Sequence, residues 1–202
     1  MRLGIIGGAF DPIHVGHLAA AHAAAECAEL ARVVFVPTGR PPHRRATVAT
    51  AEQRLAMTRL AVGGEEKFAV SDLEVRRAGV SYTADTLKEL HELHPDDELF
   101  LILGWDAARL FRSWHVPDAV RRLATVVIVS RPGSGVLDRA AVEAAGLDPE
   151  RTVWCERRTP DVSASALRRA LSRGKPVTDH VPAAVAAYID EHGIYRDNRR
   201  VG

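Results

Sequence analysis

The sequence is poor in cysteine and in lysine. Its two cysteines, Cys27 and Cys155, lie far apart, and neither a Cys-x-x-Cys pair nor the Cys/His spacing of a zinc site occurs. We therefore expect neither a disulfide framework nor a structural metal, and we expect a reducing cytoplasm as the compartment. Lysine occurs only at Lys67, Lys88 and Lys175, so arginine carries nearly all the positive charge.

The chain also lacks an excess of either charge and a long apolar run. Its 27 basic and 26 acidic residues nearly cancel, which argues against a nucleic-acid partner held by a strongly basic face. Small anionic substrates need only local positive charge. The opening run, residues 1–8, is too short for a signal peptide, and no later run approaches membrane-spanning length. We expect a soluble protein without a membrane partner, and a homo-oligomer is compatible with the sequence.

Short apolar runs alternate with longer segments of helical period. The first apolar run is followed by an Ala-rich helix expected over residues 18–30. Several runs are continuously hydrophobic rather than alternating, which is typical of strands covered on both faces. The pattern predicts an α/β protein with a doubly wound parallel sheet, forming one domain over residues 1–202 with a C-terminal helical part from about residue 160. The strand-like runs are 3–6, 33–37, 68–73, 98–103, 125–130 and 152–155.

Ligands of such sheets bind beyond the carboxyl ends of the strands, and the loop after the first strand carries the strongest motif. Residues 7–17 read Gly-Gly-Ala-Phe-Asp-Pro-Ile-His-Val-Gly-His. The two glycines let the backbone approach a ligand, and Pro12 suits the first turn of a helix. His14 and His17 are three residues apart, so on a helix they share one face and can direct N–H donors at a phosphate near its positive end. This loop therefore predicts an anion site.

Two further helix starts carry polar and aromatic side chains. Ser163 is a natural N-cap, and Arg168 follows about one turn later, so this start can hold phosphates. The helix expected from Ser81 to about His94 offers another set of N–H groups. Tyr82 and Trp114 add aromatic faces that could stack on a flat ring, and the less favoured alternative is that Trp114 is a core residue.

These motifs resemble the nucleotidyltransferase superfamily with the His-x-Gly-His signature. The resemblance spans nearly the whole chain and implies a Rossmann-like nucleotidyltransferase fold. Within the superfamily, the middle of the chain is similar to bacterial nicotinate-nucleotide adenylyltransferases, through Pro-Pro-His at 41–43, Ser-Tyr-Thr at 81–83 and Ser-Trp at 113–114. It implies transfer of AMP from ATP to nicotinate mononucleotide, with Mg²⁺ held chiefly by the ATP phosphates and no metal ligands from the protein.

The resemblance also implies roles for individual residues. Residue by residue, it assigns the reaction to His14, His17 and Arg168. It assigns ATP binding to Gly8, Ala9, Phe10, His17, His43, Gly104, Asp106, Ser163, Ser165 and Arg168, and nicotinate nucleotide binding to Gly7, Ser81, Tyr82, Thr83, Trp114 and Arg131. The segment 38–48 would cover the phosphates as a lid. Asp106 could also be a helix N-cap, and the two roles can coexist.

Two alternatives remain open at this point. A pantetheine-phosphate adenylyltransferase would share the first loop and the Ser-x-Ser-x-x-Arg segment, but the motifs of residues 81–83 and 113–114 would have no evident task in it. A non-catalytic nucleotide-binding domain is the alternative from another class, yet the Gly-x-Gly-x-x-Gly and Gly-x-x-x-x-Gly-Lys patterns are absent. The pair of histidines with Arg168 favours catalysis.

Overall fold

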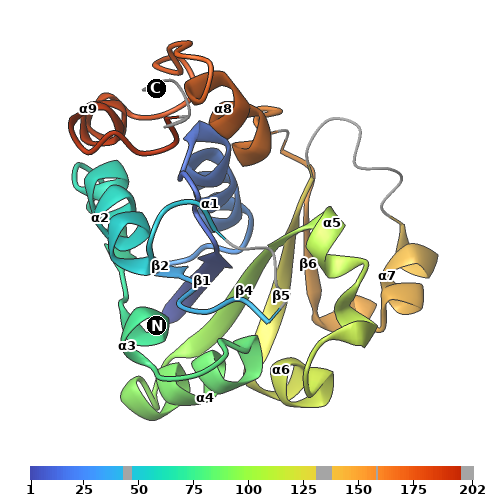
Figure 1. The fold of residues 1–202 in the computed structure, drawn as a ribbon. Coiled ribbons are helices and arrows are strands. Elements are labelled where there is room, and N and C mark those ends of the chain that lie inside the picture. Colours follow the sequence, from blue (N-terminus) through green and yellow to red (C-terminus); the bar gives the residue numbers. More distant parts are fainter. Residues whose placement is uncertain (43–46, 131–137, 158, 197–202) are drawn as a thin grey trace.

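The computed structural model describes residues 1–42, 47–130, 138–157 and 159–196. Within these residues, six parallel strands form one sheet in the order β3-β2-β1-β4-β5-β6 (Figure 1). The chain fills one half of the sheet first and then returns to β4 beside β1, which confirms the predicted doubly wound parallel sheet and places its switch point between these two strands. The strands are β1 (Arg2–Gly8), β2 (Arg32–Pro37), β3 (Phe68–Val70), β4 (Glu98–Gly104), β5 (Ala124–Val129) and β6 (Thr152–Cys155).

Helices cover both faces of the sheet (Figure 1). One face is covered by α1 (Val15–Cys27), α2 (Ala51–Val62), α8 (Ala164–Leu171) and α9 (Ala183–Glu191). The other is covered by α4 (Thr83–Leu93), α5 (Trp105–Ala108), α6 (Pro117–Leu123) and α7 (Arg139–Ala145). The short elements α3 (Leu73–Arg76), η1 (Phe111–Ser113) and η2 (Pro149–Arg151) complete the connections.

Alternate residues of each central strand enter the two cores. In β4, Leu101 packs with the cluster under α4 and α6, whereas Ile102 packs with the cluster under α1 and α2. Val127 and Ile128 divide in the same way in β5. Because both sides of a strand are buried, its sequence is continuously apolar, which is the physical reason that the hydrophobic runs predicted the architecture.

The sequence misplaced the boundaries of two elements. The first helix runs over Val15–Cys27 and not over residues 18–30, because His14 already takes the extended N-cap conformation and the chain turns at Glu29, whose φ is +50°. The run 68–73 is a strand only to Val70, because Leu73 begins α3 and its N–H donates to the Ser71 hydroxyl at 3.3 Å.

The expectation of no disulfide was wrong for this structure. Cys27, at the end of α1, is bonded to Cys155, at the end of β6, across a sequence separation of 128 residues. The chain brings these elements together only through the fold, so no local spacing could have shown the pair.

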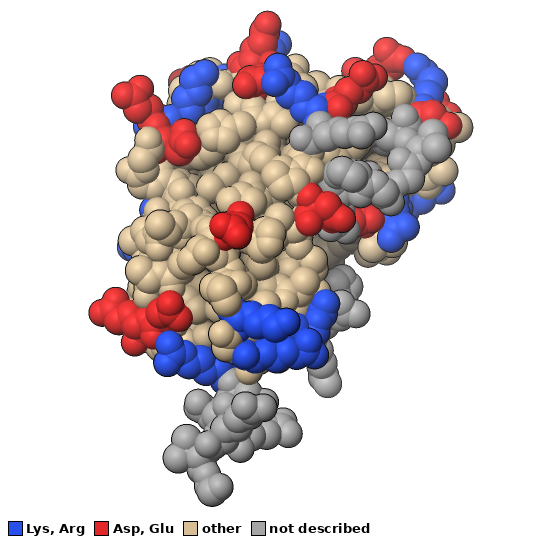
Figure 2. Space-filling model, turned by 90° about the horizontal axis from the view of Figure 1, so that it is seen from above, with Lys and Arg blue, Asp and Glu red and all other residues tan. Residues whose placement is uncertain are grey.

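The molecular surface carries both signs of charge. Figure 2 shows the face on the side of α8 and α9, where Lys and Arg gather along one edge and acidic side chains occur at several other places. No helix among the described residues is long and apolar enough to cross a bilayer.

Candidate active site

The loop between β1 and α1 brings the two signature histidines together. His14 is the N-cap of α1 and is 6% exposed, and His17 lies one turn later. Their rings are stacked, with centroids 3.7 Å apart and an interplanar angle of 20°. The predicted shared face is therefore confirmed. Pro12, in contrast, lies ahead of the helix and not in its first turn.

The surroundings of His17 fix its protonation. Its Nδ1 accepts the backbone N–H of His14 at 3.2 Å, so Nδ1 carries no proton. Burial, and next the neighbouring His14 ring, hold the pKa of His17 well below its usual range, so the ring is neutral near pH 7. The remaining proton must then sit on Nε2, on the opposite side of the ring. His17 is thus a neutral side chain that can donate a hydrogen bond from Nε2.

The backbone at this helix start is less available than the sequence suggests. The N–H of Val15 donates to the carbonyl of His180 at 3.0 Å, and the N–H of His17 donates to the carbonyl of His14 at 2.9 Å. Two of the first N–H groups are therefore already used within the protein. The histidine side chain, more than the bare helix end, is the feature here that can meet an anion.

Gly7, Gly8 and Gly16 have different reasons to be glycine. A Cβ at Gly7 would meet nothing within 4 Å, so this position stays open to a ligand. A Cβ at Gly8 would lie 3.0 Å from the ring of Phe10, which is itself buried and contacts His17 edge-on at 5.0 Å. A Cβ at Gly16 would lie 3.1 Å from the His14 ring, so this glycine lets the ring lie where it does.

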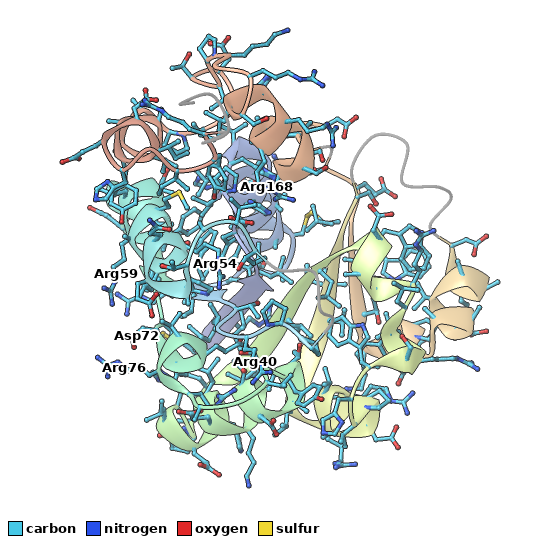
Figure 3. The ribbon with its side chains drawn as sticks, in the orientation of Figure 1. Arg40, Arg54, Arg59, Asp72, Arg76 and Arg168 are labelled. Carbon is cyan, nitrogen blue, oxygen red and sulfur yellow. A yellow bond between two sulfur atoms is a disulfide. The ribbon has the colours of Figure 1, made fainter. Side chains whose placement is uncertain are left out.

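A second helix start brings Arg168 to the same loop. Arg168 of α8 donates from Nη1 to the backbone carbonyl of Asp11 at 2.6 Å, and its side chain remains 31% exposed (Figure 3). Ser163 is the N-cap residue of α8 as predicted, but its hydroxyl pairs with that of Ser165 at 2.8 Å instead of capping the helix. The two hydroxyls and the guanidinium form a partly exposed polar group beside the histidine loop.

Two buried charges support this loop, and sequence reasoning missed both. Asp11 is 4% exposed, and its carboxylate accepts the N–H groups of Val48 and Ala49 at 2.9 and 3.0 Å. Arg54 of α2 is 1% exposed and donates to the carbonyls of Ala9 and Gly39 at 2.7 and 3.1 Å. Burial lowers the pKa of Arg54. In Figure 3 Arg54 lies inside the molecule, whereas Arg59, Asp72 and Arg76 form an ion-pair group at its outer edge.

Beyond β4, the residues divide between core and surface. Gly104 is exposed and is the N-cap of α5, and a Cβ there would meet nothing within 4 Å. Trp105 is 7% exposed and belongs to the core. Asp106 is partly buried and lies 3.7 Å from Arg109. The N-cap role considered for Asp106 is wrong, because Gly104 occupies that position.

Aromatic rings gather at the start of α4. Tyr82 is the N-cap of α4, and its ring lies 4.1 Å from that of His115. Trp114 is partly buried, 5.4 Å from the Phe111 ring, so it is neither a fully buried core residue nor free of the core. His115 is an aromatic partner that the sequence-derived set of site residues did not include.

Ser81 and Thr83 frame this aromatic group. Ser81 is 5% exposed, its N–H donates to the Arg40 carbonyl at 2.8 Å, and its hydroxyl accepts from the Arg40 N–H at 3.3 Å. Ser81 therefore ties the segment after β2 to α4, while Thr83 begins that helix and is partly buried. His43 and Arg131, and residues 43–46 of the lid expected over 38–48, lie outside the described residues.

Comparison with known proteins agrees with this arrangement. Residues 5–170 match the cytidylyltransferase-like family. The chain is 44% identical over 196 residues to the probable nicotinate-nucleotide adenylyltransferase of Thermus thermophilus, covering 97% of this chain and all of that protein. It is 40% identical over 199 residues to the protein of the same name from Dehalococcoides mccartyi, covering 96% and 97% of the two chains.

The fold is shared with a solved structure of lower sequence identity. The nicotinic acid mononucleotide adenylyltransferase of Plasmodium falciparum, complexed with NaAD, superposes with a TM-score of 0.76 at 19% identity, over 96% of this chain and 97% of that one. This similarity extends over the sheet and both helical layers. The chain therefore belongs to the cytidylyltransferase-like family and, within it, to the nicotinate-nucleotide adenylyltransferases.

Proposed function

We propose that this protein transfers AMP from ATP to nicotinate mononucleotide and releases pyrophosphate and nicotinate adenine dinucleotide. The observation that carries the proposal is that His17, whose Nδ1 accepts the His14 backbone N–H, lies on the loop that also receives Arg168. This pair offers one neutral and one cationic donor to a phosphate chain. Both lie where the sheet switches between β1 and β4.

In the proposed reaction a phosphate oxygen of the acceptor attacks the α-phosphorus of ATP. A bond forms between that oxygen and the α-phosphorus, and the bond from the α-phosphorus to the oxygen bridging to the β-phosphate breaks. An ionised phosphate needs no strong base, so the protein contributes alignment and stabilisation of developing charge. His17 donates to the α-phosphate, with His14 holding its ring in place, and Arg168 with Ser163 and Ser165 receives the departing phosphates.

The remaining sequence-derived residues complete the two subsites. Gly104 and Asp106 line the nucleotide side, together with the backbone around Gly8, Ala9 and Phe10. The acceptor side is formed by Gly7 and by the aromatic group of Tyr82 and Trp114, which His115 joins although it was not among the sequence-derived residues. A pyridine ring can stack on these faces.

The proposal includes Mg²⁺ as an ion that arrives on the ATP phosphates. Among the described residues, no group of three His, Cys, Asp or Glu side chains gathers to hold a metal. Mg²⁺ prefers oxygen ligands and keeps several waters, which suits binding through phosphate oxygens and supplies charge neutralisation there. We further propose that the protein acts in the cytoplasm on small molecules alone.

A single assay separates this function from its alternatives. The purified protein is incubated with ATP, Mg²⁺ and one acceptor at a time: nicotinate mononucleotide, nicotinamide mononucleotide or phosphopantetheine. Pyrophosphate release is then measured. We expect the first acceptor to be strongly preferred. Equal or faster turnover with phosphopantetheine would overturn the assignment, and no turnover with any acceptor would favour a nucleotide-binding domain.

A further inference from the structure

The C-terminal end of the described chain reaches back to the first loop. After α9 the chain turns at Gly193, with φ +60°, and the N–H of Ile194 donates to the carbonyl of Ile189 at 3.0 Å. Tyr195 follows with φ +68° and is 6% exposed. Its hydroxyl donates to Oδ1 of Asp11 at 2.8 Å, across 184 residues of sequence.

One oxygen of the Asp11 carboxylate therefore accepts hydrogen bonds from two parts of the chain that are far apart in sequence. Oδ1 receives both the Tyr195 hydroxyl and the Ala49 N–H, while Oδ2 receives the Val48 N–H. Oδ2 also lies 3.6 Å from Nη1 of Arg168, which donates to the Asp11 carbonyl instead. Burial, and next the Asp11 charge, raise the pKa of the Tyr195 hydroxyl, so it stays a neutral donor.

We propose that Tyr195 is a positioning residue for Arg168, acting through Asp11. The Tyr195 hydroxyl and the two loop N–H groups satisfy the carboxylate, so the carboxylate does not draw the guanidinium into a full ion pair. Arg168 thus keeps its bond to the Asp11 carbonyl and a partly exposed side chain for the phosphates of ATP. This inference rests on the role of Arg168 in the proposed function.

Removing the Tyr195 hydroxyl leaves the Asp11 carboxylate with one hydrogen bond fewer. A buried carboxylate that loses a hydrogen bond seeks another donor, and the nearest cation is Arg168 at 3.6 Å. The guanidinium then turns toward Oδ2 and away from the phosphates. The reaction step suffers, whereas the aromatic acceptor group around Tyr82 has no part in the change.

Tyr195→Phe tests this with Tyr188→Phe as the matched control. Both changes delete one phenolic hydroxyl from the same end of the chain, and Tyr188 stacks on His192 at 4.0 Å. We expect Tyr195→Phe to lower kcat by about tenfold to a hundredfold, the range for a lost hydrogen bond to a charged group, with the KM of the acceptor unchanged. Tyr188→Phe should leave both constants as in the wild type.

Two further measurements separate positioning from mere stability. If Tyr195 acts through Arg168, adding Tyr195→Phe to Arg168→Ala should lower kcat no further, so the two changes are not additive. Pyrophosphate should also bind more weakly to folded Tyr195→Phe than to Tyr188→Phe in calorimetry. A variant that only melts earlier, with full kcat in its folded fraction or with additive losses, would overturn the inference. A wild type without turnover would overturn the proposed function, and pyrophosphate binding would still test the inference.

Discussion

At the scale of single residues, the two imidazoles of the first loop have unequal tasks. His14 donates its backbone N–H to the ring of His17, and in the proposed function His17 donates its outer N–H to the substrate. A donor that meets charge only as it develops lowers the transition state more than the ground state. The loss of His17 should therefore affect turnover more than binding.

We expect His17→Ala to reduce kcat by about 10² to 10³ and to change the KM of ATP much less. Steady-state kinetics on the folded variant would measure this. The control is His22→Ala on the same helix, because His22 is a surface residue 3.4 Å from Glu65 and should leave kcat unaltered. A full kcat in folded His17→Ala would show that this histidine is only structural.

The sequence singles out His14, His17 and Arg168 as candidates because short motifs with a known chemical use contain them. It could not predict Asp11 and Arg54, the buried charged residues that hold this loop in place. An arginine within a helix of mixed composition such as α2 resembles a solvated surface residue, yet Arg54 is buried and donates to two carbonyls. Asp11 lies within the motif, but its partners are 37 or more residues away, so its task becomes visible only in three dimensions.

At the scale of elements, the segment after β2 is held against α3 and α4 at a glycine. A Cβ on Gly39 would lie 2.0 Å from the carbonyl oxygen of Glu74, a backbone atom that cannot swing aside. The Gly39 carbonyl also accepts from Arg54. The neighbouring Arg40 backbone pairs with Ser81, so a shift here reaches the start of α4.

Gly39→Ala should therefore lower the free energy of unfolding by about 1 to 3 kcal/mol, as overpacking typically does. Urea unfolding would measure it. Gly64→Ala is the matched control, since a Cβ there would meet nothing within 4 Å. Equal stability of the two variants would contradict the close approach.

The aromatic group comes from the start of α4 and from the turn after η1. A substitution of Trp114 tests whether this group binds the acceptor. Trp114→Ala should raise the KM of the acceptor roughly ten- to a hundredfold while the KM of ATP changes little, taking base–aromatic stacking as the guide. Trp154→Ala, which removes another partly buried indole from β6, is the control. An unchanged acceptor KM in well-folded Trp114→Ala would refute the stacking role. A fall in stability that harms both substrates equally would mark Trp114 as core.

The sequence predicted the elements better than their ends. Apolar runs located all six strands, and the runs that are continuously apolar mark the strands buried on both faces. Helix ends depend on caps and turns, and an N-cap histidine is not among the usual signals. The start of α1 was therefore misplaced.

At the scale of the whole molecule, the Cys27–Cys155 bond ties the end of α1 to the end of β6. A bond that closes 128 residues of chain restricts the unfolded state, and loops of this size are associated with about 2 to 5 kcal/mol. The double variant Cys27→Ser, Cys155→Ser should melt below the oxidised wild type in calorimetry.

Reduction supplies the control for this prediction. With an excess of dithiothreitol, the wild type should lose the advantage over the double variant, because both then lack the bond. This is also the form expected in a reducing cytoplasm. Two titratable thiols in the oxidised, unfolded wild type would contradict the bond.

The contact between Asp11 and Tyr195 also orders events during synthesis. A ribosome delivers the first loop early and Tyr195 much later, since Asp11 and Tyr195 are separated by 184 positions. The central strand β1 can pair with β2 and β4 well before then, whereas Asp11 gains its hydrogen bond from Tyr195 only after that residue has been synthesised. A chain truncated before Tyr195 would therefore retain its central strands but leave the Asp11 carboxylate without that donor.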